Sequence, residues 1–271
     1  MSDGIDTRVV AEHWGREGLG QGILDALAAA GKNLDALTID DLAPADQFHG
    51  GGKGTTVRLA RLAGLSPGLR VLDVGGGLGG PARTLAVEFG CRVTVIDLTD
   101  SYVSAARLLT ERLGLGGHVS HHVGNALELP FDDGAFDVVW TQNSGMNIAD
   151  KERLYAGFHR VVRSGGTLAL QEPMAGPVEP PIFPLMWARD SASSFLRVPA
   201  QMRALVARAG FEVRAWDDVT AETAGPGAAA IPAHSIQRLV MGERLEAITR
   251  AGQRNRDEGR IVMVQAVFAR P

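Results

Sequence analysis

The chain has 271 residues, of which 45% are hydrophobic, and a formal net charge of −4. A chain of this size can bury a full core, and its pI near 6.0 provides no basic surface for nucleic acid or anionic lipid. No apolar run approaches the roughly 20 residues that span a bilayer, and the amino terminus lacks the pattern of a secretory signal. We therefore expect a cytoplasmic protein that acts on a small molecule, with no nucleic-acid partner and no membrane span. A homo-oligomer remains possible.

The first 65 residues carry helical patterns. Apolar residues recur at helical spacing between Ile23 and Leu34, and a further helix is predicted over residues 54–62. We interpret residues 1–65 as an amino-terminal helical cover and residues 66–271 as the main domain.

An apolar strand then runs through Asp73 into a cluster of glycines. Gly75, Gly77 and Gly79 stand in this cluster, and Pro81 suits the first turn of a helix. Glycines let the backbone turn tightly and approach a ligand closely. The spacing also matches the dinucleotide fingerprint, so the glycines alone indicate only a ligand at a strand-to-helix turn.

Strands and helices alternate over residues 69–172. The strands are predicted over 71–74, 93–96, 118–123, 137–141 and 167–172, and the helices over 82–88, 102–113 and 151–162. This alternation indicates an α/β fold with a doubly wound, mostly parallel sheet. The cation and glycines of residues 163–166 are expected to end the third helix.

Two further positions point to an adenosine-containing ligand. Asp97 ends the second predicted strand, where its carboxylate can accept hydrogen bonds from both ribose hydroxyls, and Leu98 follows it. Asn125 and Ala126 follow the third strand. A ribose acid is shared by nicotinamide and S-adenosylmethionine (SAM) enzymes, so it does not distinguish them.

In order, these motifs resemble the class I SAM-dependent methyltransferases, from about Asp46 to the carboxyl terminus. The likeness is greatest to the sarcosine/dimethylglycine and tocopherol methyltransferase type. It implies a Rossmann-like sheet of seven strands whose last strand is antiparallel, and it implies SAM as cofactor. The cofactor-binding residues it implies are Gln47, Asp73, Gly75, Gly77, Gly79, Asp97, Leu98, Asn125, Ala126 and Gln142. The chain departs from the type at Asn143, where a histidine is expected, and at Pro173.

After Glu172 the chain becomes rich in proline and aromatic residues, which suits a pocket wall. Cap segments are expected near 175–200 and 222–258. A helix is predicted over 201–209, a strand over 211–219, a long helix over 235–250 and a closing strand over 261–269.

Candidate reactive residues are few, because transfer of a methyl group mainly requires positioning and exclusion of water. Glu172 ends the fifth strand and is the best-placed acid, either as a general base or as a positioning group. His49, before a glycine-rich turn, is the second catalytic candidate. Asn143, Met146 and Trp187 are the candidate substrate-binding residues. No cluster with metal-ligand spacing is present in the sequence.

The expected function is transfer of a methyl group from SAM to a small molecule, such as a natural product or an amine, with nitrogen, carbon and oxygen acceptors open. One alternative is an NAD-dependent oxidoreductase, whose fingerprint does not call for Asp73 or for the Asn125–Ala126 element. The other is a SAM-binding scaffold without enzymatic activity.

Overall fold

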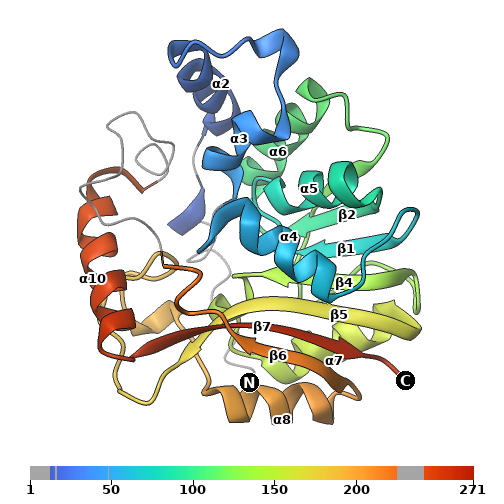
Figure 1. Cartoon of the computed structure of the whole chain (residues 1–271), viewed down its shortest axis with the longest axis vertical. Coiled ribbons are helices and arrows are strands. Elements are labelled where there is room, and N and C mark those ends of the chain that lie inside the picture. Colours follow the sequence, from blue (N-terminus) through green and yellow to red (C-terminus); the bar gives the residue numbers. More distant parts are fainter. Residues whose placement is uncertain (1–12, 16, 48, 225–240) are drawn as a thin grey trace.

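The computed structural model describes residues 13–15, 17–47, 49–224 and 241–271. Within them one sheet has the strand order β3-β2-β1-β4-β5-β7-β6 (Figure 1). Its strands are β1 (Arg70–Val74), β2 (Arg92–Asp97), β3 (Val119–Val123), β4 (Phe136–Gln142), β5 (Val162–Ala175), β6 (Glu212–Asp218) and β7 (Ile261–Ala269). The first five are parallel, and β7 runs antiparallel between β5 and β6. The predicted doubly wound sheet with an antiparallel last strand is confirmed.

Helices connect and cover these strands. They are α2 (Leu19–Ala29), α3 (Ile39–Asp46), α4 (Gly52–Leu62), α5 (Gly80–Phe89), α6 (Asp100–Arg112), α7 (Lys151–Val161), α8 (Pro199–Arg208) and α10 (Leu245–Asp257). Short 3₁₀ segments are η1 (Leu34–Ala36), η2 (Gly145–Asn147), η3 (Ser191–Ser193) and η5 (Gly242–Arg244).

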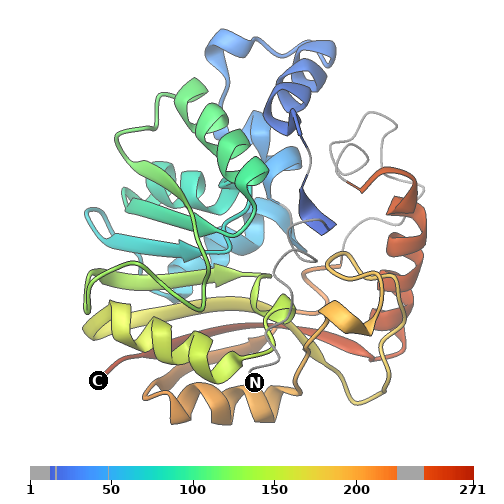
Figure 2. The same ribbon diagram turned by 180° about the vertical axis from the view of Figure 1, so that it is seen from behind.

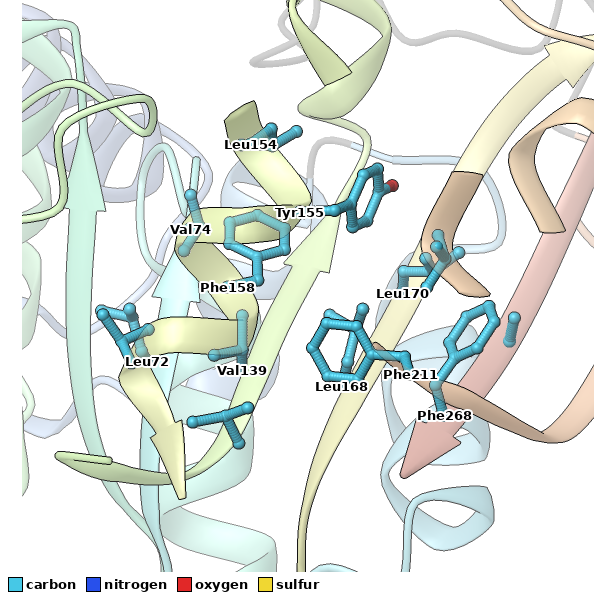
Figure 3. Close-up of a cluster of buried hydrophobic side chains, with 14 of the residues drawn as sticks. Leu72, Val74, Val139, Leu154, Tyr155, Phe158, Leu168, Leu170, Phe211 and Phe268 are labelled. Atoms are coloured by element: carbon cyan, nitrogen blue, oxygen red, sulfur yellow. The ribbon is translucent and has the colours of Figure 1, made fainter. Parts of the chain in front are cut away.

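The sheet buries both of its faces. Val71 and Leu72 are neighbours on β1, so their side chains point to opposite faces. Val71 packs in one apolar cluster with Leu85 of α5, whereas Leu72 packs in another with Phe158 of α7. Figure 3 shows Phe158 among side chains of the strands, beside Val74 and above Leu72 and Val139. Figures 1 and 2 show α7 on the face of the sheet opposite to α4 and α5.

The amino-terminal helices fall into two groups. Ile23 of α2 and Leu42 of α3 pack with Leu109 of α6 and Ile248 of α10, away from the sheet. By contrast, Leu59 of α4 belongs to the cluster on the sheet itself. The division at residue 65 between a cover and a main domain stays a prediction.

Two predicted helix boundaries were wrong, and a third was right although the residues after it have another structure. The helix expected from Ile23 to Leu34 ends at Ala29, because Gly31 takes a left-handed conformation with φ of 78°, and Leu34 lies in η1. The third helix ends at Val161, one residue before its predicted end, but residues 163–166 do not cap it: they form the irregular start of β5, which hydrogen-bonds to β4 and β7. The long late helix runs on to Asp257. Residues 235–240 of that predicted helix lie outside the described part of the chain.

Pro173 lies inside β5 and does not end it. The carbonyl of Gln171 accepts a hydrogen bond from the N–H of Asn143, so Gln171 faces the β4 side. Pro173 stands two residues further and faces the same side, where β4 has already ended at Gln142. Its missing N–H therefore costs no ladder hydrogen bond.

Candidate active site

A cavity of about 430 Å³ opens at the carboxyl ends of β1, β2 and β4. This is the edge at which doubly wound sheets bind ligands. Ten of the predicted site residues line it, namely His49, Asp73, Gly75, Gly77, Asp97, Leu98, Asn125, Ala126, Gln142 and Asn143.

The glycine loop forms the floor of the cavity. Gly75 and Gly77 have φ of 73° and 52°, in the left-handed region that favours glycine. A Cβ on Gly75 would stand 2.3 Å from the Cβ of Ser144, whereas one on Gly77 would meet nothing nearer than the Tyr102 ring at 3.6 Å. Close packing thus requires glycine at position 75, and the cavity adjoins Gly77. Gly79 does not line the cavity; it is the N-cap of α5.

Asp97 is tied to that loop. Its carboxylate accepts hydrogen bonds from the backbone N–H groups of Gly77 and Thr99, both at 2.9 Å. Each carboxylate oxygen keeps further acceptor capacity, because a carboxylate offers about four lone-pair sites. Burial raises the pKa of Asp97 above its usual range. The position suits an acceptor for two hydroxyl groups of a ligand.

Asp73 is a buried acid whose carboxylate is not fully hydrogen-bonded. Its side-chain atom Oδ2 has no hydrogen-bond partner. Burial and the negative charge of Asp97 raise the pKa of Asp73 to about 8. A cation in the cavity would stabilise the charged form of this pair.

Asn125 and Ala126 line the cavity beyond β3. The Oδ1 atom of Asn125 accepts a hydrogen bond from the N–H of Leu127 at 2.9 Å, which closes a local turn and fixes the amide. A fixed amide beside a backbone segment can read the edge of a planar ring.

A buried network joins the His49 turn to β4. The Oε1 atom of Gln142 accepts hydrogen bonds from Trp140 Nε1 and Thr56 Oγ1, both at 3.1 Å. Because the indole can only donate, the amide orientation of Gln142 is set, and its Nε2 donor is left without a partner at the cavity. The Nε2 atom of His49 lies 3.0 Å from Gln47 Oε1 and 3.1 Å from Thr56 Oγ1. Enclosure of the imidazole lowers the pKa of His49 to about 4, so the ring is neutral near pH 7.

Gln47 itself lies behind the cavity wall. Its Nε2 atom donates to Thr84 Oγ1 at 3.0 Å, and its Oε1 atom faces Thr56 and His49. The structure therefore places Gln47 next to predicted site residues without bringing it to the lining. Phe48 lies outside the described residues.

Asn143 lines the cavity in an unusual conformation. With φ of 55° it is the one residue other than glycine with a positive φ among the described residues. Such conformations persist only where the surroundings hold them. The N–H of Asn143 donates to Gln171 O at 2.8 Å, and the Gln171 side chain lies 3.5 Å from Asn143 Oδ1.

A row of amides crosses the sheet beneath this residue. Gln171 pairs in register with Gln142 on one side and with Gln265 of β7 on the other. The Nε2 atom of Gln265 donates to Gln171 Oε1 at 2.8 Å, and Gln171 Nε2 donates to Gly50 O at 3.2 Å. The last strand thus supports the turn that carries His49.

Besides Gly79 and Gln47, three further predicted site residues lie away from the cavity lining. Glu172 is buried, and its Oε1 atom accepts hydrogen bonds from the N–H groups of Gly145 and Ser144 at 2.8 and 3.3 Å. Met146 and Trp187 pack together in a separate apolar cluster. The structure does not bring these three side chains to the cavity.

Sequence reasoning missed several lining residues, which are Trp14, Tyr102, Asn147, Ile148 and Arg153. Tyr102 follows Asp97 by five residues, at the start of a helix that begins at the cavity edge, and this proximity was the available signal. Nothing local marks Trp14, because it reaches the cavity only through tertiary packing of the amino-terminal segment.

Among the described residues, no group of three histidine, cysteine or carboxylate side chains could hold a metal ion. Nor does any described helix combine the length and apolar character needed to cross a membrane.

Comparison with known proteins gives the family. Residues 72–170 match the family model described as a methyltransferase domain. The chain is 30% identical to Methyltransferase GfsG of Streptomyces halstedii over 213 residues, which cover 77% of this chain and 74% of that protein. The chain therefore belongs to the SAM-dependent methyltransferases.

Two further likenesses refine this result. Over 132 residues, 49% of this chain, it is 35% identical to a glycine/sarcosine/dimethylglycine N-methyltransferase of Actinopolyspora halophila, but the match spans only 23% of that relative's length. A geranyl diphosphate C-methyltransferase structure from Streptomyces coelicolor A3(2) superimposes with a TM-score of 0.70 at 18% identity, covering 98% of each chain. The structural likeness confirms the class I methyltransferase fold.

Proposed function

We propose that the protein transfers the methyl group of SAM to a small-molecule acceptor and releases S-adenosylhomocysteine. The observation that carries the proposal is the cavity at the strand ends, where Gly77 and Asp97 meet with Asp73 beside them. When bound, SAM supplies a sulfonium whose methyl group is open to in-line attack.

The residues present fit that cofactor. Asp97 would accept the ribose hydroxyls, and Asn125 with Ala126 would meet the adenine. The partnerless donor of Gln142 suits a carboxylate, and the buried charge of Asp73 suits a cation. Leu98 would pack beside the ribose and Gly75 would shape the turn.

The chain's own contribution to the reaction is positioning and exclusion of water. His49 is the predicted base that lines the cavity, and its neutral ring could accept a proton. Both of its nitrogens already face protein groups, which favours a structural role. The acceptors most compatible with this site are therefore nucleophiles that need no proton removed, such as a neutral amine or an electron-rich carbon.

The acceptor is proposed to be a small molecule because the relatives include enzymes named for small substrates. Asn143, Asn147 and Ile148 line the part of the cavity beyond β4 and would contact the acceptor. A cytoplasmic location and the absence of a nucleic-acid partner stay predictions, as does a homo-oligomer.

Equilibrium binding of SAM and of NAD to the purified chain tests the cofactor. We expect SAM to bind and NAD not to bind. The reverse would support an oxidoreductase.

Release of S-adenosylhomocysteine with a panel of amines, phenols and terpenoids then tests the transfer. Tight SAM binding without turnover on any member, including ligands co-purified with the chain, would support the non-enzymatic scaffold.

A further inference from the structure

A single helical turn, η2, separates the cavity from two buried ionisable side chains of opposite charge. Ser144 and Asn147 at the two ends of this turn line the cavity. Behind the turn lie Glu172 of β5 and Lys151 of α7, whose side chains are both buried. The general-base role expected for Glu172 requires it to reach the reacting atoms, whereas its contacts are all with the turn and with the core.

The two side chains bind different backbone groups of the turn. Glu172 accepts from the backbone N–H groups of Ser144 and Gly145, which begin it. Lys151 Nζ donates to the carbonyls of Gly145 and Ile148 at 2.6 and 2.8 Å. The carboxylate thus binds N–H groups at the start of the turn, and the ammonium group binds the carbonyls of its first residue and of the residue that follows it, so each charge meets backbone groups of the opposite polarity.

The turn η2 and the carboxylate of Glu172 are packed closely together. A Cβ on Gly145 would stand 3.0 Å from Glu172 Oε1, so the turn approaches the carboxylate as nearly as a glycine allows. Burial lowers the pKa of Lys151 to about 8 while the charge of Glu172 opposes that change. Burial also raises the pKa of Glu172, and the N–H of Gly145 and then the charge of Lys151 oppose that rise.

The same turn holds the segment after β5. The Nδ2 atom of Asn147 donates to the carbonyls of Trp187 and Ser193 at 3.0 and 2.7 Å. The N–H of Phe195 donates to the carbonyl of Met146 at 2.8 Å. Displacement of η2 would thus move both the cavity wall and the predicted cap near 175–200.

We propose that Glu172 and Lys151 form a positioning pair that sets the acceptor end of the cavity by fixing η2 and, through it, the cap. Neither acts as a general base. The kinetic part of this proposal rests on the proposed methyl transfer, but its structural part does not.

Hydrogen exchange measures the structural part. Glu172→Gln and Lys151→Met should each speed amide exchange at Ser144, Gly145 and Phe195 by about tenfold or more, because charge-assisted hydrogen bonds are lost. Exchange at Gly77 and Thr99 should not change. The matched control is Glu152→Gln, which removes an exposed carboxylate next to Lys151 on the same helix. Unchanged exchange at all three amides in both variants would overturn the proposal.

Kinetics with the identified acceptor separates positioning from base catalysis. Each variant should raise the acceptor KM by about tenfold, leave kcat within about threefold and keep the SAM dissociation constant near that of the natural chain. The variant with both substitutions should resemble either single variant, since each substitution disrupts the same positioning pair. A fall in kcat of about 10²- to 10⁴-fold for Glu172→Gln alone, with Lys151→Met normal, would instead identify a general base.

Gly145→Ala provides a second route should a charge variant fail to fold. Its added methyl group pushes the turn from Glu172 without changing any charge, and it should reproduce the rise in acceptor KM. A normal KM in Gly145→Ala, with unchanged exchange at Phe195, would also overturn the proposal. If the natural chain methylates no acceptor, the proposed function fails. The exchange measurements still decide whether Glu172 and Lys151 fix η2.

Discussion

The carboxylate of Asp97 and the backbone N–H of Gly77 are joined by a hydrogen bond of 2.9 Å, which links the end of β2 to the glycine loop of β1. One residue therefore serves two purposes. It fixes the loop and retains acceptor sites for a ligand.

Asp97→Asn tests this pairing. The amide keeps one oxygen for the loop but loses its charge and half of its acceptor capacity, so SAM affinity should fall by about 2 to 4 kcal/mol. Titration calorimetry measures the loss, and circular dichroism should show the fold unchanged. An unaltered dissociation constant would remove Asp97 from the binding site.

Substitution of Gly75 should affect stability, whereas substitution of Gly77 should affect SAM binding. Gly77→Val should fold yet abolish SAM binding, because its side chain would enter the cavity. Gly75→Val should lower the melting temperature, because its Cβ would collide with Ser144. Both variants place a β-branched residue at positive φ and share that strain. A difference between them therefore reports what each added side chain meets, which is Ser144 at position 75 and the cavity at position 77. Normal SAM affinity in Gly77→Val would show that this glycine is only structural.

SAM affinity should depend on pH through Asp73. In the ligand-free protein Asp73 is protonated below its pKa of about 8, and a bound cation favours the ionised form. Binding at pH 6.5 should therefore release up to about one proton, and affinity should rise as pH increases towards 8 and then level off. Calorimetry in buffers of different ionisation heat measures the released proton.

The control for this pH dependence is Asp73→Asn. It should bind SAM more weakly and without the proton release. It should also stabilise the ligand-free protein above pH 4, because an acid whose folded pKa is raised costs stability once the unfolded chain ionises. A natural chain that releases no proton between pH 6 and 8 would contradict the assignment.

The pair Arg83 and Asp46 should contribute strongly to stability. Their atoms Nη2 and Oδ2 lie 2.7 Å apart with side-chain exposures of 0% and 3%. Arg83→Met leaves an unpaired buried carboxyl and should lower the free energy of unfolding by about 3 to 5 kcal/mol. Urea denaturation measures it. Arg208→Met, from an exposed pair with Glu152, should cost less than about 1 kcal/mol. Equal losses in the two variants would refute the distinction.

The same pair bears on removal of the amino-terminal segment. Deleting residues 1–50 takes away Asp46 and the helices α2 and α3, which pack on α6. The shortened chain should retain the sheet with reduced stability and turn over poorly, since His49 of the cavity wall is lost with them. Full activity of the shortened protein would contradict this expectation.

The sequence was sufficient for the features that depend on local pattern. Apolar runs and glycines located β1 to β4 to within about a residue, and Asp97 and Asn125 reached the cavity because strand ends meet at one edge. Glu172 was predicted to reach the ligand on the same reasoning. The side chain of Glu172 does not reach the cavity, because η2 lies between its carboxylate and the cavity. A short turn between a strand and a helix has no hydrophobic periodicity, so the sequence did not predict η2. Asn147 of the same turn was missed for this reason, whereas Trp14 was missed because only tertiary packing brings it to the cavity.

Strand β7 has a consequence for how the chain is made. It is the last strand in chain order, yet it lies between β5 and β6 and supplies Gln265 to the amide row that supports Gly50. During synthesis, the edges of β5 and β6 that pair with β7 remain without strand partners until residues 261–269 leave the ribosome. The nascent chain therefore passes through a stage in which its glycine loop is complete but the turn that carries His49 lacks the support of Gln265. Chaperone capture of translation intermediates should be strongest in that interval.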